Sequence, residues 1–450
     1  MMRVTRRFGR GPRRLRVGKK LLIAVLAVVM IHSAAVLVMR LRVESELMAL
    51  KKQGYPITAS DIVYRPVPAA DTAAPIYSDI FVRVSDSDAT RVESMIEGLL
   101  NPLKSPYSST DWNTMKQAIA PYRDIPILVR RAEDSPAGYV SDHPSTSYMG
   151  QGPNADYLEK TSWLLIGEAM LAARDHQSAQ AFHLITLDLR LEKCIRDDSD
   201  VEADRARFEI ANEACTAIQT IAQPGNISSP EERTMEDEIG RIDLSSTIRP
   251  RMIADRANTI DNIQGIGANG AARLLRTLRL GEEQEFCLKC EGSYIWSPIF
   301  YADELAYLHA EGREIDHVTE PWRVRMERHI DSRVHLPLYD VLTWLWGPDP
   351  EIQPRNRDLA IAGLAGSRIF LALLRYKARS GSYPTSLNEL SPLLGGSVPI
   401  DPFSGKGFEY QRLGGGFTLR SVGPSLNGDN PEPAWVTQTS NLDVIAWSGS

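Results

Sequence analysis

A run of nineteen almost wholly apolar residues near the N-terminus constrains the fold of this chain more than any other feature. It reads LLIAVLAVVMIHSAAVLVM over residues 21–39, and only His32 and Ser33 within it are polar. At about 1.5 Å per residue such a helix rises about 28 Å, close to the ~30 Å hydrocarbon core of a bilayer. The run therefore predicts a transmembrane helix that contacts the lipid bilayer directly.

The charges around this run predict its orientation. Residues 1–20 contain nine Lys and Arg side chains and no acid. Because such basic flanks stay in the cytoplasm, we expect a cytoplasmic tail at 1–20 and the chain after Arg40 across the membrane. A cleaved signal peptide is the alternative, since Ser33-Ala34-Ala35 has the form of a cleavage site. The apolar run continues to Met39, which favours an uncleaved anchor.

The composition excludes several classes of protein. With 450 residues, of which 43% are hydrophobic and 24% charged, the chain is unlike disordered, collagen-like or polytopic membrane proteins. The net charge is −6, although the first twenty residues are strongly basic, so the remainder is distinctly acidic. An acidic body repels phosphates, and we therefore expect no nucleic-acid partner.

Between the anchor and the C-terminal segment, the chain is predicted to be helical. Residues 40–80 read as a helical stalk followed by an extended spacer, because four prolines lie within 53–80. Residues 81–350 read as a helical extracytoplasmic body with long amphipathic stretches at 157–197 and 201–222. Ser229-Pro230-Glu231-Glu232 is typical of a helix start.

One part of this body has the spacing of a tetratricopeptide unit. Four residues fall at the offsets that such repeats use, around a turn at Asp175-His176, and they are Trp163, Ile166, Gly167 and Ala179. A second copy does not follow 34 residues later, and such arrays need about three repeats. A single helical hairpin is therefore the favoured interpretation.

The motifs weighed for chemistry do not indicate a reaction. Gly265 to Gly270 match G-x-G-x-x-G but follow polar, helix-like residues instead of a buried strand, so a joint between helices is favoured. The sequence has no G-x-S-x-G, H-E-x-x-H or phosphate-loop motif. We therefore predict no catalytic residue and no cofactor. The acids on the predicted helices are interpreted as a solvated face: Glu159, Glu168, Asp188, Glu192, Asp204, Glu209 and Glu213.

The cysteines and one group of aromatic residues leave alternatives open. Cys194 and Cys215 lie on adjacent predicted helices and form either a disulfide or two free thiols. Cys287 and Cys290 form a C-x-x-C that indicates a local disulfide or inert thiols. Four aromatic residues between 320 and 347 predict core packing, with a ligand groove as the alternative: Trp322, Tyr339, Trp344 and Trp346.

The last hundred residues predict a different kind of structure. A helix at about 357–380 ends at Gly381, and strands at 408–410 and 417–423 flank the glycine turn 414–416. We expect a long helix packed on a small antiparallel sheet. The fold class is accordingly mainly α with a C-terminal α+β domain at 355–450.

This C-terminal order of elements resembles the globular end of the type II secretion major pseudopilin. The resemblance is carried by Tyr383-Pro384 after the helix, by Asp401-Pro402 before the first strand and by Ser421-Val422-Gly423 after the second. It implies a calcium ion held by the acidic loop, at Asn427, Asp429 and Asp443. The chain lacks the prepilin junction, and over 300 residues separate its anchor from the sheet, so we do not expect a pilus subunit.

The whole architecture also resembles a broad group of uncharacterised bacterial proteins with an anchor, a Pro-rich spacer such as Thr72 to Tyr77, and a helical body. This resemblance implies a single-pass protein of the bacterial inner membrane with envelope protein partners. We expect a non-catalytic binding or scaffolding role. The alternative is a membrane-tethered hydrolase or carbohydrate-active enzyme that uses acids and aromatic residues of the body. A concave pocket with converging carboxylates or histidines distinguishes the two.

Overall fold

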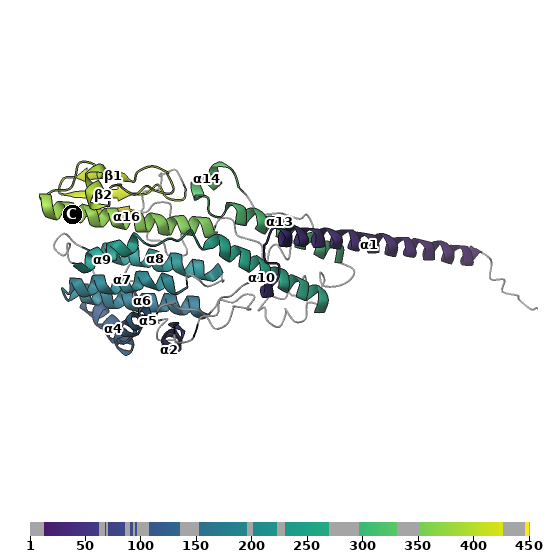
Figure 1. Ribbon diagram of the computed structural model, residues 1–450, viewed down its shortest axis with the longest axis horizontal. Coiled ribbons are helices and arrows are strands. Elements are labelled where there is room, and N and C mark those ends of the chain that lie inside the picture. Colours follow the sequence, from purple (N-terminus) through teal and green to yellow (C-terminus); the bar gives the residue numbers. More distant parts are fainter. Residues whose placement is uncertain are drawn as a thin grey trace, which may run out of the picture. The chain divides into compact units, whose positions relative to one another are not determined.

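The structure, a computed structural model, is mainly helical, with an apolar N-terminal helix and a small antiparallel sheet near the C-terminus (Figure 1). At this level the predicted fold class is confirmed. The residues that the structure describes are 13–62, 68, 71–85, 91–92, 95–96, 108–135, 153–195, 201–222, 230–269, 297–330, 352–425 and 446–449.

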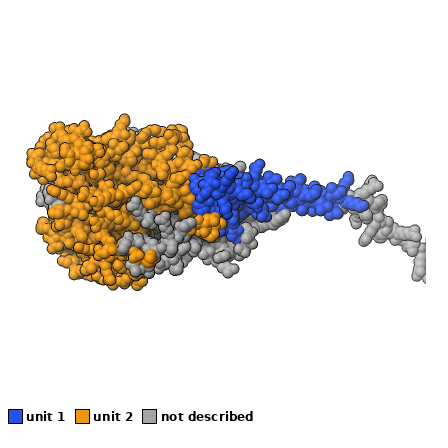
Figure 2. All heavy atoms as spheres, in the orientation of Figure 1, with its two compact units in different colours: residues 1–57, 260–312, 333–348 blue, residues 58–259, 313–332, 349–450 orange. Residues whose placement is uncertain are grey.

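The chain divides into two compact units (Figure 2). Unit 1 comprises residues 1–57, 260–312 and 333–348. Unit 2 comprises residues 58–259, 313–332 and 349–450. Each unit is described by itself below.

Unit 1 contains the long helix α1 (Arg13–Lys52). Its part from Lys19 onward includes an 18-residue window with a mean hydropathy of 2.8, and none of that window is buried. The last turns of α1 are different, because Val43, Leu47 and Leu50 lie on one face and are buried. An exposed apolar helix of this length is compatible with a membrane anchor.

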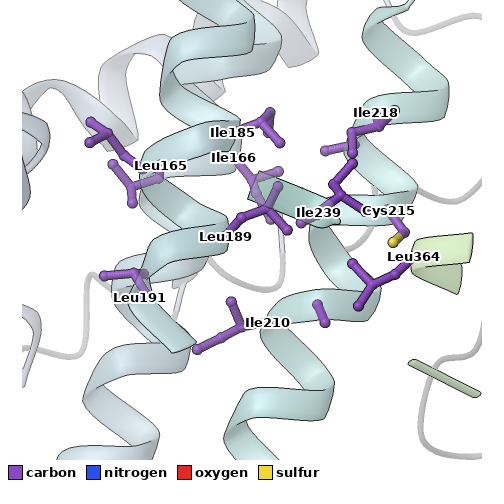
Figure 3. Packing of buried hydrophobic residues seen from close by; sticks show 14 of the residues in the cluster. Leu165, Ile166, Ile185, Leu189, Leu191, Ile210, Cys215, Ile218, Ile239 and Leu364 are labelled. Atoms are coloured by element: carbon purple, nitrogen blue, oxygen red, sulfur yellow. The ribbon is translucent and has the colours of Figure 1, made fainter. Parts of the chain in front are cut away.

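Unit 2 contains a set of helices that surround one hydrophobic core. Its helices before residue 240 are α2 (Ala74–Val84), α4 (Ser109–Ile119), α5 (Ile125–Glu133), α6 (Pro153–Arg174), α7 (Ser178–Cys194), α8 (Val201–Ile221) and α9 (Pro230–Ile239). The helices α6, α7 and α8 pack against one another, and α9 packs against α7. Figure 3 shows their side chains meeting in the core, among them Leu165, Ile166, Ile185, Leu189, Ile210, Ile218 and Ile239.

The helix α2 corrects the expectation of an extended spacer up to residue 80. Pro75 lies in the first turn of α2, where a helix tolerates proline because the missing N–H has no intrahelical partner there. The helix contacts α5 and α6 through one buried face. That face consists of Ala74, Tyr77, Ile80, Phe81 and Val84. The prolines therefore mark a helix start as well as a spacer.

After α9, the described residues form the helices α10 (Ile248–Asn269), α13 (Ser297–His317) and α14 (Trp322–Glu327). Both α10 and α13 have residues in each of the two units. The next helix, α16 (Ile352–Ser380), packs on α8, and 78% of its most apolar window is buried inside the protein. Burial identifies α16 as a core helix, although its length and hydropathy suit a membrane span.

The sheet follows α16. Gly381 ends the helix with a left-handed φ of 78°, and a 3-10 helix covers Leu387–Leu393. The strands β1 (Glu409–Leu413) and β2 (Gly416–Arg420) form the expected hairpin around Gly414 and Gly415. The strand β3 (Ala446–Gly449) pairs antiparallel with β2, which gives the order β1-β2-β3.

Two contacts attach the sheet to α16 and close its loops. A Cβ on Gly366 of α16 would lie 2.0 Å from the ring of Trp447, which is 1% exposed, so only glycine fits there. The buried carboxylate of Asp401 accepts hydrogen bonds from the Ser421 hydroxyl (2.8 Å) and the Phe403 N–H (3.1 Å). Asp401 thus connects the loop before β1 to the end of β2.

Candidate functional site

Several predicted site residues lie outside the described residues. They are the calcium ligands Asn427, Asp429 and Asp443, the pair Cys287 and Cys290, and the aromatic residues Tyr339, Trp344 and Trp346. The calcium site therefore stays a prediction. Within the described ranges, no group of three or more His, Cys, Asp or Glu side chains is arranged to hold a metal ion.

The two described cysteines are free thiols, so the alternative of a Cys194–Cys215 disulfide is wrong for this structure. The Cys194 thiol donates a hydrogen bond to the hydroxyl of Tyr77 at 2.7 Å. Cys215 lies against Gly363 of α16 and interacts with Ser367. Burial raises the pKa of both thiols to about 12, which makes them unreactive.

The glycine motif does not form a dinucleotide-binding turn. Residues 265–269 are the last residues of α10, and α10 is a continuous helix from Ile248. The motif requires a buried strand that leads into a tight turn and then a helix. Gly265 and Gly267 thus belong to α10 and do not form the expected joint between helices, while Gly270 lies outside the described residues.

The four residues with tetratricopeptide spacing lie on a real helical hairpin, formed by α6 and α7. Trp163 and Ile166 are buried. A Cβ on Gly167 would lie 2.5 Å from Cδ1 of Ile119, so this glycine permits close packing of α4. His176 reverses the chain between the two helices with a left-handed φ of 59°. Trp163, Ile166 and Gly167 therefore serve packing, whereas Ala179 in the first turn of α7 is exposed.

The interpretation of the acids on α6, α7 and α8 as a solvated face is wrong for three of them, which are buried. Asp188, Glu192 and Asp204 are at most 2% exposed. The reason is that α7 is surrounded by α6, α8, α9 and α5, so its polar side also lies inside the protein. Helical periodicity identifies residues on one face but not how many neighbours cover the helix.

Two of these acids are paired with buried arginines. Arg207 is fully buried and forms ion pairs with Glu192 at 2.7 Å and Asp204 at 3.2 Å. Its Nη2 also donates to the carbonyl oxygen of Asp243 at 2.8 Å. Arg251 of α10 also pairs with Asp204. This network connects α7, α8 and α10, and its charges compensate one another.

The neighbouring layer of the same interface holds carboxyls without such compensation. Asp188 on α7 is fully buried, and neither of its carboxyl oxygens has a hydrogen-bond partner among the described residues. The hydroxyl of Ser162 on α6 donates to Glu213 of α8 at 3.2 Å. We call Glu159, Asp188, Glu209 and Glu213 the carboxyl cluster.

Burial dominates the electrostatics of this cluster. It raises the pKa of Asp188 and of Glu213 well above the ordinary value, and the neighbouring carboxyls add to the effect at Glu213. For Glu159, burial and Glu209 together raise the pKa to about 9. Burial thus favours the protonated form of Glu159, Asp188 and Glu213.

The cation nearest to the cluster lies at its outer edge. Arg205 is 25% exposed and pairs with Glu159 at 3.0 Å, with Glu209 at 2.7 Å and with Asp156 at 3.2 Å. None of these three ion pairs involves Asp188 or Glu213. We call Asp188 and Glu213 the inner pair, and the hydroxyl of Ser162 donates a hydrogen bond to its Glu213 member.

A separate concavity lies at the turn between α6 and α7. It has a volume of about 830 Å³ and is lined by side chains of both signs and by His176. Burial raises the pKa of Glu168 in its wall, while the charges of Arg123 and Lys116 act against that rise. The charged and titratable lining residues are Lys116, Arg123, Glu168, Asp175 and His176. This pocket offers both donors and acceptors to a polar ligand.

The aromatic residue Trp322 belongs to the core. It is 6% exposed, its indole N–H donates to the carbonyl of Pro424 at 2.9 Å, and its backbone N–H donates to Asp358 at 2.7 Å. A buried indole with a satisfied N–H is typical of packing. For Trp322 the core interpretation is confirmed.

Comparisons with known proteins leave the family of the chain open. No model of a protein family, no curated protein and no solved structure matches it. The resemblance of residues 356–448 to a pseudopilin tail therefore stays a prediction.

Proposed function

We propose that this chain is a single-pass protein of the bacterial inner membrane whose extracytoplasmic body binds or scaffolds envelope proteins. The observation that carries the proposal is α1, whose apolar part is exposed along its length and has a mean hydropathy of 2.8. Exposed apolar surface of this extent is unfavourable in water and favourable in a bilayer. The basic residues of 1–20 support a cytoplasmic N-terminus.

The body has the properties of a rigid platform for a partner. The helices of unit 2 share one core, and the Arg207 network fixes α7, α8 and α10 to one another. The pocket at the α6–α7 turn is the concave surface that we assign to a polar partner group. Its cations Lys116 and Arg123 come from the α4 region, and its acids come from α6 and the turn that follows it.

Membrane anchoring is tested by substitution at the centre of the apolar run. Met30→Arg places a charge at mid-membrane, which costs about 2.5–3.5 kcal/mol of insertion free energy. We expect the variant chain to appear in the carbonate-soluble fraction while the wild type stays in the membrane pellet. Val82→Arg is the matched control, because Val82 is 74% exposed on α2, outside the apolar run. Equal retention of Met30→Arg and wild type contradicts the anchor.

Partner binding is tested by charge reversal in the pocket. Detergent-extracted wild-type chain is expected to recover a stoichiometric envelope protein, and Lys116→Glu with Arg123→Glu is expected to lose it. Arg328→Glu is the control, since Arg328 is 61% exposed and lies outside the pocket wall. Recovery that is unchanged in the double variant contradicts the assigned surface.

A membrane-tethered hydrolase remains the second candidate, and it is favoured by Glu168 and His176 in one pocket. A carboxyl and an imidazole supply general acid and base groups. This candidate predicts ester, peptide or glycoside hydrolysis by the purified chain that Glu168→Gln abolishes and Glu327→Gln leaves unchanged. Hydrolysis that survives Glu168→Gln contradicts it.

A further inference from the structure

The carboxyl cluster has a geometry that a structural role alone does not require. Each of the three packed helices contributes to it, with Glu159 from α6, Asp188 from α7, and Glu209 and Glu213 from α8. Asp188 has no exposed surface, and both of its oxygens lack a hydrogen-bond partner among the described residues. An ionised carboxylate in such a position is strongly unfavourable, so the site requires a proton.

We propose that the carboxyl cluster is a proton-linked lock on the α6–α7–α8 interface. The interface is closed while Asp188 and Glu213 carry protons, and it loosens when they lose them. The proton is the ligand of this site, and its loss loosens the packing of the three core helices α6, α7 and α8.

Ser162 shows why the inner pair needs protons. Its hydroxyl has a single proton, which it donates to Glu213 at 3.2 Å. It lies close enough to influence Asp188 as well, but one hydroxyl cannot neutralise two carboxylates. A proton on either carboxyl turns an acceptor-only group into a donor and removes the repulsion between the two.

The surrounding groups do not supply the missing charge. The one cation among the charged neighbours that the structure gives for this layer, Arg205, is already shared by three carboxyls at the outer edge. A further titratable group near Asp188 is the Cys215 thiol of α8, which interacts with the hydroxyl of Ser367 on α16. The titratable and charged groups around the inner pair are Asp156, Glu159, Arg205, Glu209 and Cys215.

The next layer of the interface provides an internal contrast. Glu192 lies one helical turn after Asp188 on α7 and is equally buried, but it pairs with Arg207 of α8. Glu192 therefore has a buried cation as its partner, whereas Asp188 has no hydrogen-bond partner for either carboxyl oxygen among the described residues. The two layers thus differ in whether a cation compensates the buried carboxyls, and we expect the loosening to be confined to the layer of Asp188 and Glu213.

The sign of the pH dependence follows from the raised pKa values. In the unfolded chain these carboxyls ionise above about pH 4, whereas in the folded chain they stay protonated to higher pH. Their contribution to stability is therefore complete at acidic pH and is lost as the pH rises. Unfolding near pH 7 is expected to release protons.

The test uses the full chain in detergent and compares Asp188→Asn with Glu192→Gln. Wild-type unfolding in denaturant at pH 7 is expected to release about one proton more than that of Asp188→Asn. The Asp188→Asn variant is expected to have a higher midpoint than wild type at pH 8, and the difference is expected to be smaller at pH 5.5. Glu192→Gln is expected to lower the midpoint at both pH values and to keep the wild-type change of midpoint with pH. Equal proton release by wild type and Asp188→Asn overturns the proposal.

Two further measurements do not depend on the folding of one variant. Glu213→Gln is expected to repeat the effect of Asp188→Asn. In the wild type, the infrared C=O band of protonated carboxylic acids is expected to persist at pH 7.5. At higher pH, where that band disappears, amide hydrogen exchange in α6, α7 and α8 is expected to become faster than the intrinsic pH dependence of exchange accounts for. A spectrum without the band at pH 7.5 overturns the proposal.

Discussion

At the scale of single residues, side-chain size and charge pairing determine what this fold tolerates. Gly366 admits the ring of Trp447, and Gly167 admits Ile119. Arg207 neutralises two buried acids. None of these roles is visible in the sequence, because each depends on a partner distant along the chain. The sequence shows that a predicted helix contains a glycine, but it does not show which side chain packs against that glycine.

The contact between Gly366 and Trp447 gives a sharp prediction. Gly366→Ala introduces a Cβ at 2.0 Å from the Trp447 ring, so the ring must move, and we expect a loss of about 1–3 kcal/mol in the free energy of unfolding. Gly363→Ala is the control, because its nearest neighbours would lie at 3.5 Å, an ordinary contact. Denaturant unfolding measures both variants, and a Gly366→Ala variant as stable as Gly363→Ala would contradict the packing.

The Arg207 network gives a second prediction at this scale. Arg207→Met leaves Glu192 without its cation and removes one of two from Asp204, and we expect a loss of about 3–5 kcal/mol. Arg83→Met is the matched control, since Arg83 is 39% exposed and its pairs with Asp79 and Asp124 lie at the surface. Such pairs contribute about 0–1 kcal/mol. Thermal unfolding that shifts equally in both variants would refute the assigned role.

At the scale of elements, local sequence signals predicted the ends of helices and the hairpin turn correctly. Features that depend on neighbouring elements, such as burial, were predicted less well. Pro230 starts α9, Gly381 ends α16, and Gly414 and Gly415 join β1 to β2, all as expected, because these residues act through their own backbone. The spacer prediction failed at α2, where proline occupies a first turn. Asp188, Glu192 and Asp204 were misassigned to a solvated face because burial depends on neighbouring helices.

At the scale of the whole molecule, the sequence predicted an anchor and a folded body, while the candidate sites came from the structure. The apolar run of α1 is visible in composition alone. The carboxyl cluster brings together Glu159 and Glu213, which lie far apart in the sequence, and the pocket joins Lys116 to His176. Such juxtapositions arise from helix packing, which a single sequence does not specify.

The central claim, an uncleaved anchor with an extracytoplasmic body, is tested most directly by reporter fusions to both ends of the full chain. Alkaline phosphatase after Ser450 and green fluorescent protein before Met1 are compared in the same bacterial host, and intact mass is recorded for the membrane fraction. We predict active phosphatase, a fluorescent N-terminus and a mass that retains residues 1–39. An inactive phosphatase, or a chain that has lost these residues, would contradict the account.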